Sequence, residues 1–220
     1  MPDIDAAARD LAAELKKARA DYAEARFEEN QTSQIAYRGK VLESIGRSAA
    51  SGGNVRALVK GGWGFTSFND FSNLPNRVSQ AVGQARATGS GKSELAEVKP
   101  VQDNVPSGVK TDPVTIPLAE KKRLLDEYNE IIWSTPNIKT SNIGYGDSRK
   151  KVTFLNSEGT FIIQERADVS IRLTAIAAKD SEVQQVGLSM GSRGDFNAIT
   201  GLHKMVKEMA QNAVNLLDAP

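Results

Sequence analysis

The chain has few side chains that could carry out catalysis. Among its 220 residues there is one histidine, His203, and there is no cysteine. Without cysteine there are no thiolate nucleophiles, disulfides or cysteine-based metal sites, and one histidine cannot build a histidine-rich zinc site. A serine–histidine–aspartate triad would have to use His203, and no nucleophile-elbow sequence accompanies it. We therefore expect no catalytic residue and no metal ligand in this chain, and interpret His203 as a helix-surface or partly buried histidine.

Three acidic pairs have spacings that could serve acid–base chemistry: Glu28–Glu29, Glu127–Glu130 and Glu165–Asp168. The first and last pairs fall on predicted strands, where their spacings direct the two side chains to opposite faces. The middle pair could share a helix face, but it lies close to three basic residues, Lys121, Lys122 and Arg123. Those charges are typical of a solvated helix surface. Glu165 interrupts an apolar strand face, and is the one acidic residue whose partner merits inspection.

The segment Thr88–Ser93 ends like a phosphate-binding loop. That motif requires glycine five positions before Gly91, and this position is Arg86. The segment also follows a predicted helix, whereas a phosphate-binding loop leads from a strand into a helix whose N-terminus holds the phosphate. We expect no nucleotide binding here.

Hydrophobic periodicity predicts four helices, with apolar stripes over residues 4–18, 74–85, 117–132 and 202–216. Asn69 or Asp70 is expected to cap the second. About nine short strands are predicted, near 22–28, 33–38, 41–45, 55–59, 63–67, 140–146, 151–156, 160–177 and 181–192. Alternation of apolar and polar residues along 161–175 is typical of an antiparallel sheet with one wet face. The predicted fold class is α+β.

The elements form two helix–strand-meander–helix halves, residues 1–92 and 117–220. An exposed connector, 93–116, joins them, and both halves are expected to belong to one N-terminal domain. The 28 basic and 27 acidic residues leave a net charge of +1, which argues against direct nucleic-acid binding. The longest run without charge, Val183–Ser192, is about half of what a membrane helix needs. With no signal-peptide pattern at the start, we expect a cytoplasmic protein that does not bind membranes.

The most distinctive segment is Gly61-Gly62-Trp63-Gly64-Phe65, followed by Asn69. Gly61-Gly62 suits a two-residue hairpin turn, because glycine tolerates the positive φ that such turns need. Trp63 and Phe65 share a strand face, so we expect them to be core or interface anchors. These six residues are the structural and interface candidates of the chain, and the contacts with substrate or partner are not assigned.

Together with Arg26–Glu29, Arg38–Val41 and Val55–Val59, this segment resembles the N-terminal half of the TldD/PmbA family, and its TldD-like branch in particular. The resemblance implies a cytoplasmic metallopeptidase, of a kind also labelled modulator of DNA gyrase. It further implies zinc in the intact protein, unfolded proteins or peptides as substrates, and a homodimer or a heterodimer with a family paralogue. The family's His-Glu-x-x-x-His helix follows the region matching Leu216–Pro220, so the resemblance assigns no catalytic or metal residue to this chain.

Two hypotheses follow. In the first, the chain is the non-catalytic N-terminal domain of a TldD/PmbA-like peptidase and helps to form its substrate chamber and dimer. An extended peptide could then add to an exposed sheet edge. In the alternative, the chain is a stand-alone protein-binding module, a modulator of a partner such as DNA gyrase, without enzymatic activity. A His-Glu-x-x-x-His encoded downstream of Pro220 would favour the first.

Overall fold

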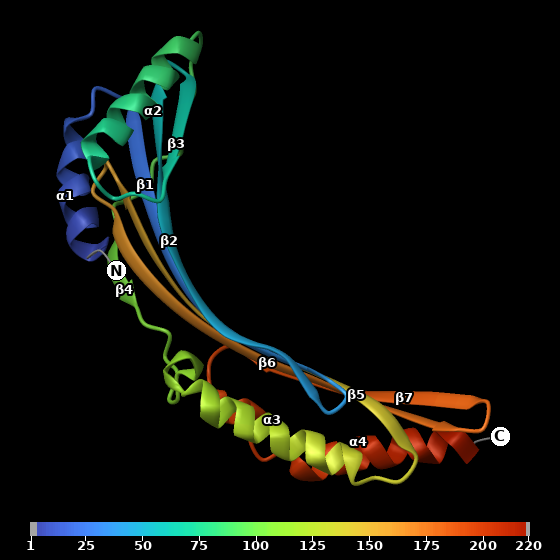
Figure 1. Cartoon of the computed structure of the whole chain (residues 1–220). Helices are drawn as coiled ribbons and strands as arrows, with labels where there is room; N and C mark the ends of the chain where they lie inside the picture. The colour runs from blue at the N-terminus through green and yellow to red at the C-terminus, as the bar shows by residue number, and fades with distance from the viewer. Residues whose placement is uncertain (1–3, 219–220) are drawn as a thin grey trace. The chain divides into compact units, whose positions relative to one another are not determined.

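The computed structural model describes residues 4–218, which form an α+β fold (Figure 1). Within this range there are four α-helices, as predicted: α1 (Ile4–Lys17), α2 (Leu74–Thr88), α3 (Leu118–Trp133) and α4 (His203–Asn215). Three short 3-10 helices accompany them: η1 (Pro113–Thr115), η2 (Phe196–Ile199) and η3 (Leu216–Asp218). None of the described helices is long and apolar enough to cross a membrane.

Seven strands form one sheet among the described residues: β1 (Tyr22–Arg38), β2 (Val41–Val59), β3 (Gly62–Phe68), β4 (Gln102–Val105), β5 (Ile138–Asn156), β6 (Phe161–Lys179) and β7 (Glu182–Ser192). The order is β3-β2-β1-β5-β6-β4, and β7 also pairs with β6. The pairs β2–β3 and β6–β7 are antiparallel, whereas β4 runs parallel to β6. The parallel pair departs from the antiparallel arrangement that we expected.

The predicted number of about nine strands is wrong, because three pairs of predicted strands are continuous. Residues 22–28 and 33–38 belong to β1, 41–45 and 55–59 to β2, and 140–146 and 151–156 to β5. Their polar middle segments change the exposure of the strand without ending its backbone pairing. The remaining difference is β4, which lies in the predicted connector and is exposed at all four residues.

The chain divides into two compact units that interleave along the sequence. Unit 1 comprises residues up to 30, 50–106 and 150–165, and unit 2 comprises 31–49, 107–149 and 166–220. In unit 1, α1 and α2 pack on the sheet around Phe27, Leu11 and Val55. In unit 2, α3 and α4 cover one face of the sheet around Tyr128, Ile171 and Leu173 (Figure 1). The division of the sequence at residues 93–116 stays a prediction.

The alternation predicted along β6 is confirmed in unit 2. Its apolar members from Ala167 to Ala177 are buried beneath the helices, whereas Ser170 and Arg172 are exposed on the opposite face. A strand residue and its neighbour point to opposite faces of the sheet. The unit 2 sheet therefore has a helix-covered apolar face and a helix-free polar face.

The start of α2 differs from the prediction that Asn69 or Asp70 would cap it. The residue before the helix is Asn73, which has a φ of 55° and makes no side-chain capping hydrogen bond. Asp70 instead accepts hydrogen bonds from the backbone N–H and the hydroxyl of Ser72, at 2.9 and 2.6 Å. Pro75 lies in the first turn, where a missing N–H costs nothing. Its presence there favours a helix that begins after the Asp70 turn.

Candidate functional site

The helix-free face of the unit 2 sheet, here called the open face, carries an open hollow of about 890 Å³. Five strands line it: β1, β2, β5, β6 and β7. The exposed members of this lining come from alternate strand positions and include Gln34, Asn142, Gly144, Ser170, Arg172 and Ser189. The alternation that buries the helix-covered face thus places these side chains in the hollow.

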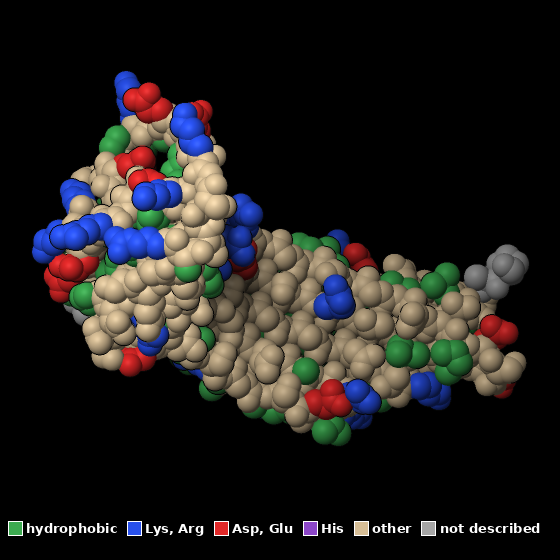
Figure 2. Space-filling model, turned by 90° about the horizontal axis from the view of Figure 1, so that it is seen from above, with side chains coloured by type: hydrophobic (Ala, Val, Ile, Leu, Met, Phe, Trp, Pro, Cys, Tyr) green, Lys and Arg blue, Asp and Glu red, His purple; other side chains and the backbone are tan. Residues whose placement is uncertain are grey.

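The open face is mostly small, polar and uncharged. In the right-hand part of Figure 2 it is largely tan, with only scattered charged side chains. Two of the charges in its lining are paired: Glu43 lies 2.9 Å from Arg38, and Asp168 lies 2.7 Å from Arg166. Such a surface can contact a polypeptide through many weak polar interactions. Its lining does not combine an acid and a base in a catalytic pair.

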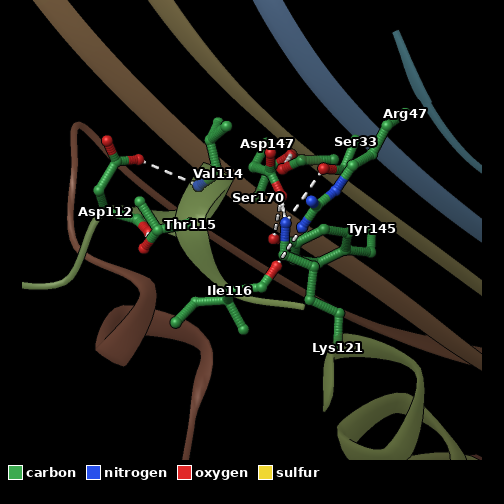
Figure 3. Close-up of polar contacts among 11 residues, drawn as sticks. Ser33, Arg47, Asp112, Val114, Thr115, Ile116, Lys121, Tyr145, Asp147 and Ser170 are labelled. Atoms are coloured by element: carbon green, nitrogen blue, oxygen red, sulfur yellow. Dashed lines mark hydrogen bonds and ion pairs between the residues drawn. The ribbon is translucent and has the colours of Figure 1, made fainter. Parts of the chain in front are cut away.

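Beneath the open face, α3 is joined to the sheet by a buried polar cluster (Figure 3). Lys121 Nζ lies 2.5 Å from Asp147 Oδ2 and donates a hydrogen bond of 3.1 Å to Ser33 Oγ. The hydroxyl of Tyr145 donates to the same carboxylate oxygen. The cluster links α3 to β1 and β5, and it positions the strands that form the middle of the hollow.

Burial governs the electrostatics of this cluster. It lowers the pKa of Lys121, although the Asp147 carboxylate opposes that shift. It also raises the pKa of Tyr145, and the hydrogen bond to Asp147 adds to the effect. Tyr145 is therefore a neutral donor. Oδ1 of Asp147 is buried without a hydrogen-bond partner, so the carboxylate relies on the Lys121 charge for compensation.

Our interpretation of Lys121 as a solvated helix charge is wrong, because its side chain is completely buried. The missed signal is its spacing. Lys121 lies three residues after Leu118, four before Leu125 and seven before Tyr128, which places it on the apolar stripe of α3. A lysine at such a position needs a buried acidic partner, and Asp147 occupies the matching buried position on β5.

The segment that leads into α3 is fixed by two arginines of the sheet. The guanidinium of Arg47 donates to the carbonyl oxygen of Ile116 (Figure 3). Arg149 lies 3.3 Å from the Asp112 carboxylate. Asp112 also accepts a hydrogen bond of 3.0 Å from the backbone N–H of Val114. These contacts hold the start of α3 in the place where Lys121 can reach the sheet.

The glycines of the Gly-Gly-Trp-Gly-Phe segment allow α2 to lie directly on β3. A Cβ atom at Gly64 would lie 1.9 Å from the carbonyl oxygen of Ala81, and one at Gly62 would lie 2.4 Å from that of Ala85. The hairpin turn itself is Lys60-Gly61, both with positive φ, rather than the Gly61–Gly62 pair that we predicted. Gly62 instead pairs with Val59.

Trp63 and Phe65 point away from α2 and are 37% and 53% exposed. The expectation that they are core residues is therefore wrong, while their role as interface anchors stays a prediction. The Arg56 guanidinium lies 4.5 Å from the centre of the Trp63 ring, and the Tyr22 ring contacts its edge. Asn69 follows β3 and lies against Gly52, where a Cβ atom would be 2.7 Å from the Asn69 amide oxygen.

The remaining sequence candidates do not converge on one site. His203 is half-exposed at the start of α4, and its Nε2 lies 3.1 Å from the Glu127 carboxylate. Glu165 is half-buried on β6. In the loop after α2, the Gly91 N–H donates to the Lys60 carbonyl, and the next helical element is η1. Within the described range, no group of three or more His, Cys, Asp or Glu residues could hold a metal ion.

Comparison with known proteins identifies the family. The sequence profile of the PmbA/TldA metallopeptidase domain 1 matches residues 23–87, and that of the central domain matches residues 111–217. The chain belongs to the TldD/PmbA family. It is 36% identical over 207 residues to a metalloprotease of Synechocystis and 28% identical over 206 residues to one of Methanothermobacter thermautotrophicus. These alignments cover 93% and 91% of the chain, but only 44% of each relative.

Solved structures show the same fold in other TldD/PmbA proteins. The crystal structure of TldE from Thermococcus kodakarensis matches 94% of the chain with a TM-score of 0.72, at 14% sequence identity. A candidate modulator of DNA gyrase from Thermotoga maritima matches 97% of the chain with a TM-score of 0.76, at 15% identity. The chain covers 47% and 48% of those two proteins, so it spans about half the length of its relatives.

Proposed function

We propose that the chain forms the non-catalytic first and central domains of a metal-dependent peptidase, with the open face of unit 2 as a wall of its substrate chamber. The observation that carries this proposal is the open hollow of about 890 Å³ over five strands, whose exposed lining residues are mostly small polar ones. The substrates are unfolded proteins or peptides. The metal-bound catalytic centre belongs to the part of the relatives that lies outside this match.

The composition of the open face suits a surface that holds many different sequences. A strongly charged wall would bind oppositely charged chains and repel others, and an apolar wall would retain hydrophobic segments. Small polar side chains such as Asn142 and Ser170 instead exchange hydrogen bonds with water for hydrogen bonds with a bound polypeptide, and each exchange yields little net free energy. An unfolded chain can therefore move along this face without being held at one sequence.

For the metal of the intact protein, which we propose is zinc, residues 4–218 offer no group of three candidate ligands. A catalytic zinc needs three protein ligands and an open position, and histidine is the commonest ligand. Among residues 4–218 no cluster of three candidate ligands occurs, and His203 lies beside one carboxylate, Glu127. The residues present thus do not fit a metal centre.

The intact protein is proposed to act in the cytoplasm as a homodimer or as a heterodimer with a family paralogue. The exposed aromatic pair on β3, Trp63 and Phe65, supports an interface in unit 1, because neighbouring exposed apolar side chains are a common feature of protein–protein contacts. This part of the proposal is tested by the mass of the complex in solution, with Trp63→Ser/Phe65→Ser as the variant that would dissociate it.

The chamber-wall proposal is tested by photo-crosslinking with the 220-residue chain. A photoreactive phenylalanine derivative at Asn142 would report on the open face, and the same group at Lys207 on the exposed side of α4 is the matched control. With unfolded casein, we expect several times more cross-linked product from position 142 than from position 207. Equal yields from both positions, or more from 207, would contradict the proposal.

A further inference from the structure

Among the described residues the sheet has four exposed edges, and three of them carry features that disfavour the addition of another strand. The edge at β3 is used by α2: the Phe65 N–H donates to Gln84 Oε1 at 3.1 Å, and the Trp63 carbonyl accepts from Thr88 Oγ1 at 3.2 Å. An incoming strand would have to displace both contacts. Side chains from a covering helix are a known way to block an edge.

Two further edges are short or charged. The edge at β4 has four residues, and one of them is Asp103. In unit 2 the edge formed by residues 41–49 of β2 carries Glu43, paired with Arg38, and Arg47, which binds the Ile116 carbonyl. Charges on an edge strand disfavour strand addition, because they would have to be desolvated beside the new strand.

On the fourth edge, β7, the described residues 4–218 provide none of these protections. It is 11 residues long, and from Val183 to Ser192 it contains neither a charged residue nor a proline. It pairs with β6 over residues 182–192, and β6 is its one strand neighbour among the described residues (Figure 1). A long, uncharged edge presents a row of backbone N–H and C=O groups that matches another extended main chain.

The side chains of β7 define what such a chain would carry. On the helix-covered side, Val186, Leu188 and Met190 are partly buried against the unit 2 core. Apolar side chains of an added strand would cover the exposed part of these three residues. On the open side Gly187, Ser189 and Gly191 leave room for almost any side chain. Because strand residues alternate between faces, the preferred occupant has an apolar residue at every second position.

We propose that the outer edge of β7 binds an extended, uncharged polypeptide segment as an additional strand, selecting apolar side chains at alternate positions. The inference rests on the proposed function for the identity of that segment as substrate. Binding itself needs no catalytic centre, so it can be measured with this chain. Strand addition here would hold one part of a substrate while the rest lies along the open face.

The test uses a neutral, fluorescent peptide of ~10 residues with valine at alternate positions. Fluorescence anisotropy should show binding, and amide hydrogen exchange should show slower exchange in β7. The same peptide with alternate amides N-methylated keeps its side chains but loses main-chain donors, and should bind roughly tenfold more weakly or not at all. Equal binding of both peptides would overturn the inference.

Matched lysine variants locate the site. Gln185→Lys places a charge on the exposed side of β7, and Gln211→Lys makes the same change on the exposed side of α4, away from the open face and from any strand edge. We expect Gln185→Lys to weaken binding roughly tenfold and Gln211→Lys to leave it unchanged. Cross-linking from Asn142 without protection of β7 would refute this inference and leave the chamber wall intact. Protection of β7 without cross-linking from Asn142 would support strand addition at β7 and contradict the chamber wall.

Discussion

Lys121 and Asp147 form an ion pair in which both side chains are completely buried, with Nζ and Oδ2 2.5 Å apart. The pair joins α3 to β5 at a point where the sheet carries the hollow on its other face. Removing two charges from water costs several kcal/mol each, and the attraction between them offsets that cost only while both are present. The stability of unit 2 should therefore depend on the two residues jointly.

Lys121→Met is expected to lower the free energy of unfolding by about 3–5 kcal/mol, since it leaves the Asp147 carboxylate buried without a countercharge. The double variant Lys121→Met/Asp147→Leu should recover most of that loss, because an apolar pair has no charge to desolvate. Urea denaturation of both proteins measures the difference. Lys122→Met, which breaks the exposed pair with Asp126, is the control and should cost less than about 1 kcal/mol. A double variant less stable than the single one would contradict this account.

Gly64→Ala is expected to destabilise unit 1 severely, because its Cβ would lie 1.9 Å from the Ala81 carbonyl oxygen, and only a shift of α2 could relieve the clash. Gly83→Ala makes the same change on α2 itself, at a position with no atom within 4 Å, and should stabilise the protein by about 0.5–1 kcal/mol. Thermal melting compares the two. A similar melting temperature for both variants would show that α2 does not lie on β3 as described.

Ionisation of the tyrosines should accompany unfolding in alkali. Burial raises the pKa of Tyr22 and of Tyr37 to about 12, from a usual value near 10, and it also raises that of Tyr128. The folded state therefore keeps protons that the unfolded state loses. For Tyr22 and Tyr37 this stabilisation is complete below pH 10, and it declines by about 1.4 kcal/mol per pH unit for each of the two as the pH rises to 12.

Tyrosinate absorbance near 295 nm and circular dichroism, followed together from pH 9 to 13, provide the measurement. The two signals should change in one step above pH 10. Tyr37→Phe removes one of the shifted groups and should make stability less dependent on pH in this range. Full ionisation near pH 10 with the fold still intact would contradict the buried positions of these tyrosines.

Local periodicity was enough to predict the helices and the alternation of buried and exposed residues along β6, because an apolar stripe is visible in the local sequence. It could not predict strand lengths, since the middle segments of β1, β2 and β5 are held by pairing with distant strands. The same limit applies to Lys121, whose burial depends on Asp147, 26 residues away. It applies also to Trp63, because α2 takes the glycine side of β3 and leaves the aromatics outside. The hollow gave no motif at all, because its residues are ordinary small polar types spread over five strands.

Phe65→Ala should change the melting temperature little, since the ring is already 53% exposed. Trp63→Ala should cost about 1–2 kcal/mol, because it removes the contacts with the Arg56 guanidinium and the Tyr22 ring. Both costs are well below the ~3–5 kcal/mol typical of an aromatic removed from a core. Differential scanning calorimetry of the two variants tests this. A loss of ~3–5 kcal/mol of stability in Phe65→Ala would show that the Phe65 ring is buried in solution.

The chain by itself should not hydrolyse peptides. Water is a poor nucleophile at neutral pH, and a peptidase of this kind needs a metal ion that lowers the pKa of bound water. The described residues contain no cluster of three candidate ligands, and His203 has one acidic neighbour, Glu127, on an exposed helix surface. Purified chain incubated with unfolded casein and zinc should therefore release no more peptide than a mock purification. A chelator should make no difference. Chelator-sensitive cleavage well above the mock level, and lost on His203→Ala, would place a catalytic metal in this chain and overturn the assignment of its domains as non-catalytic.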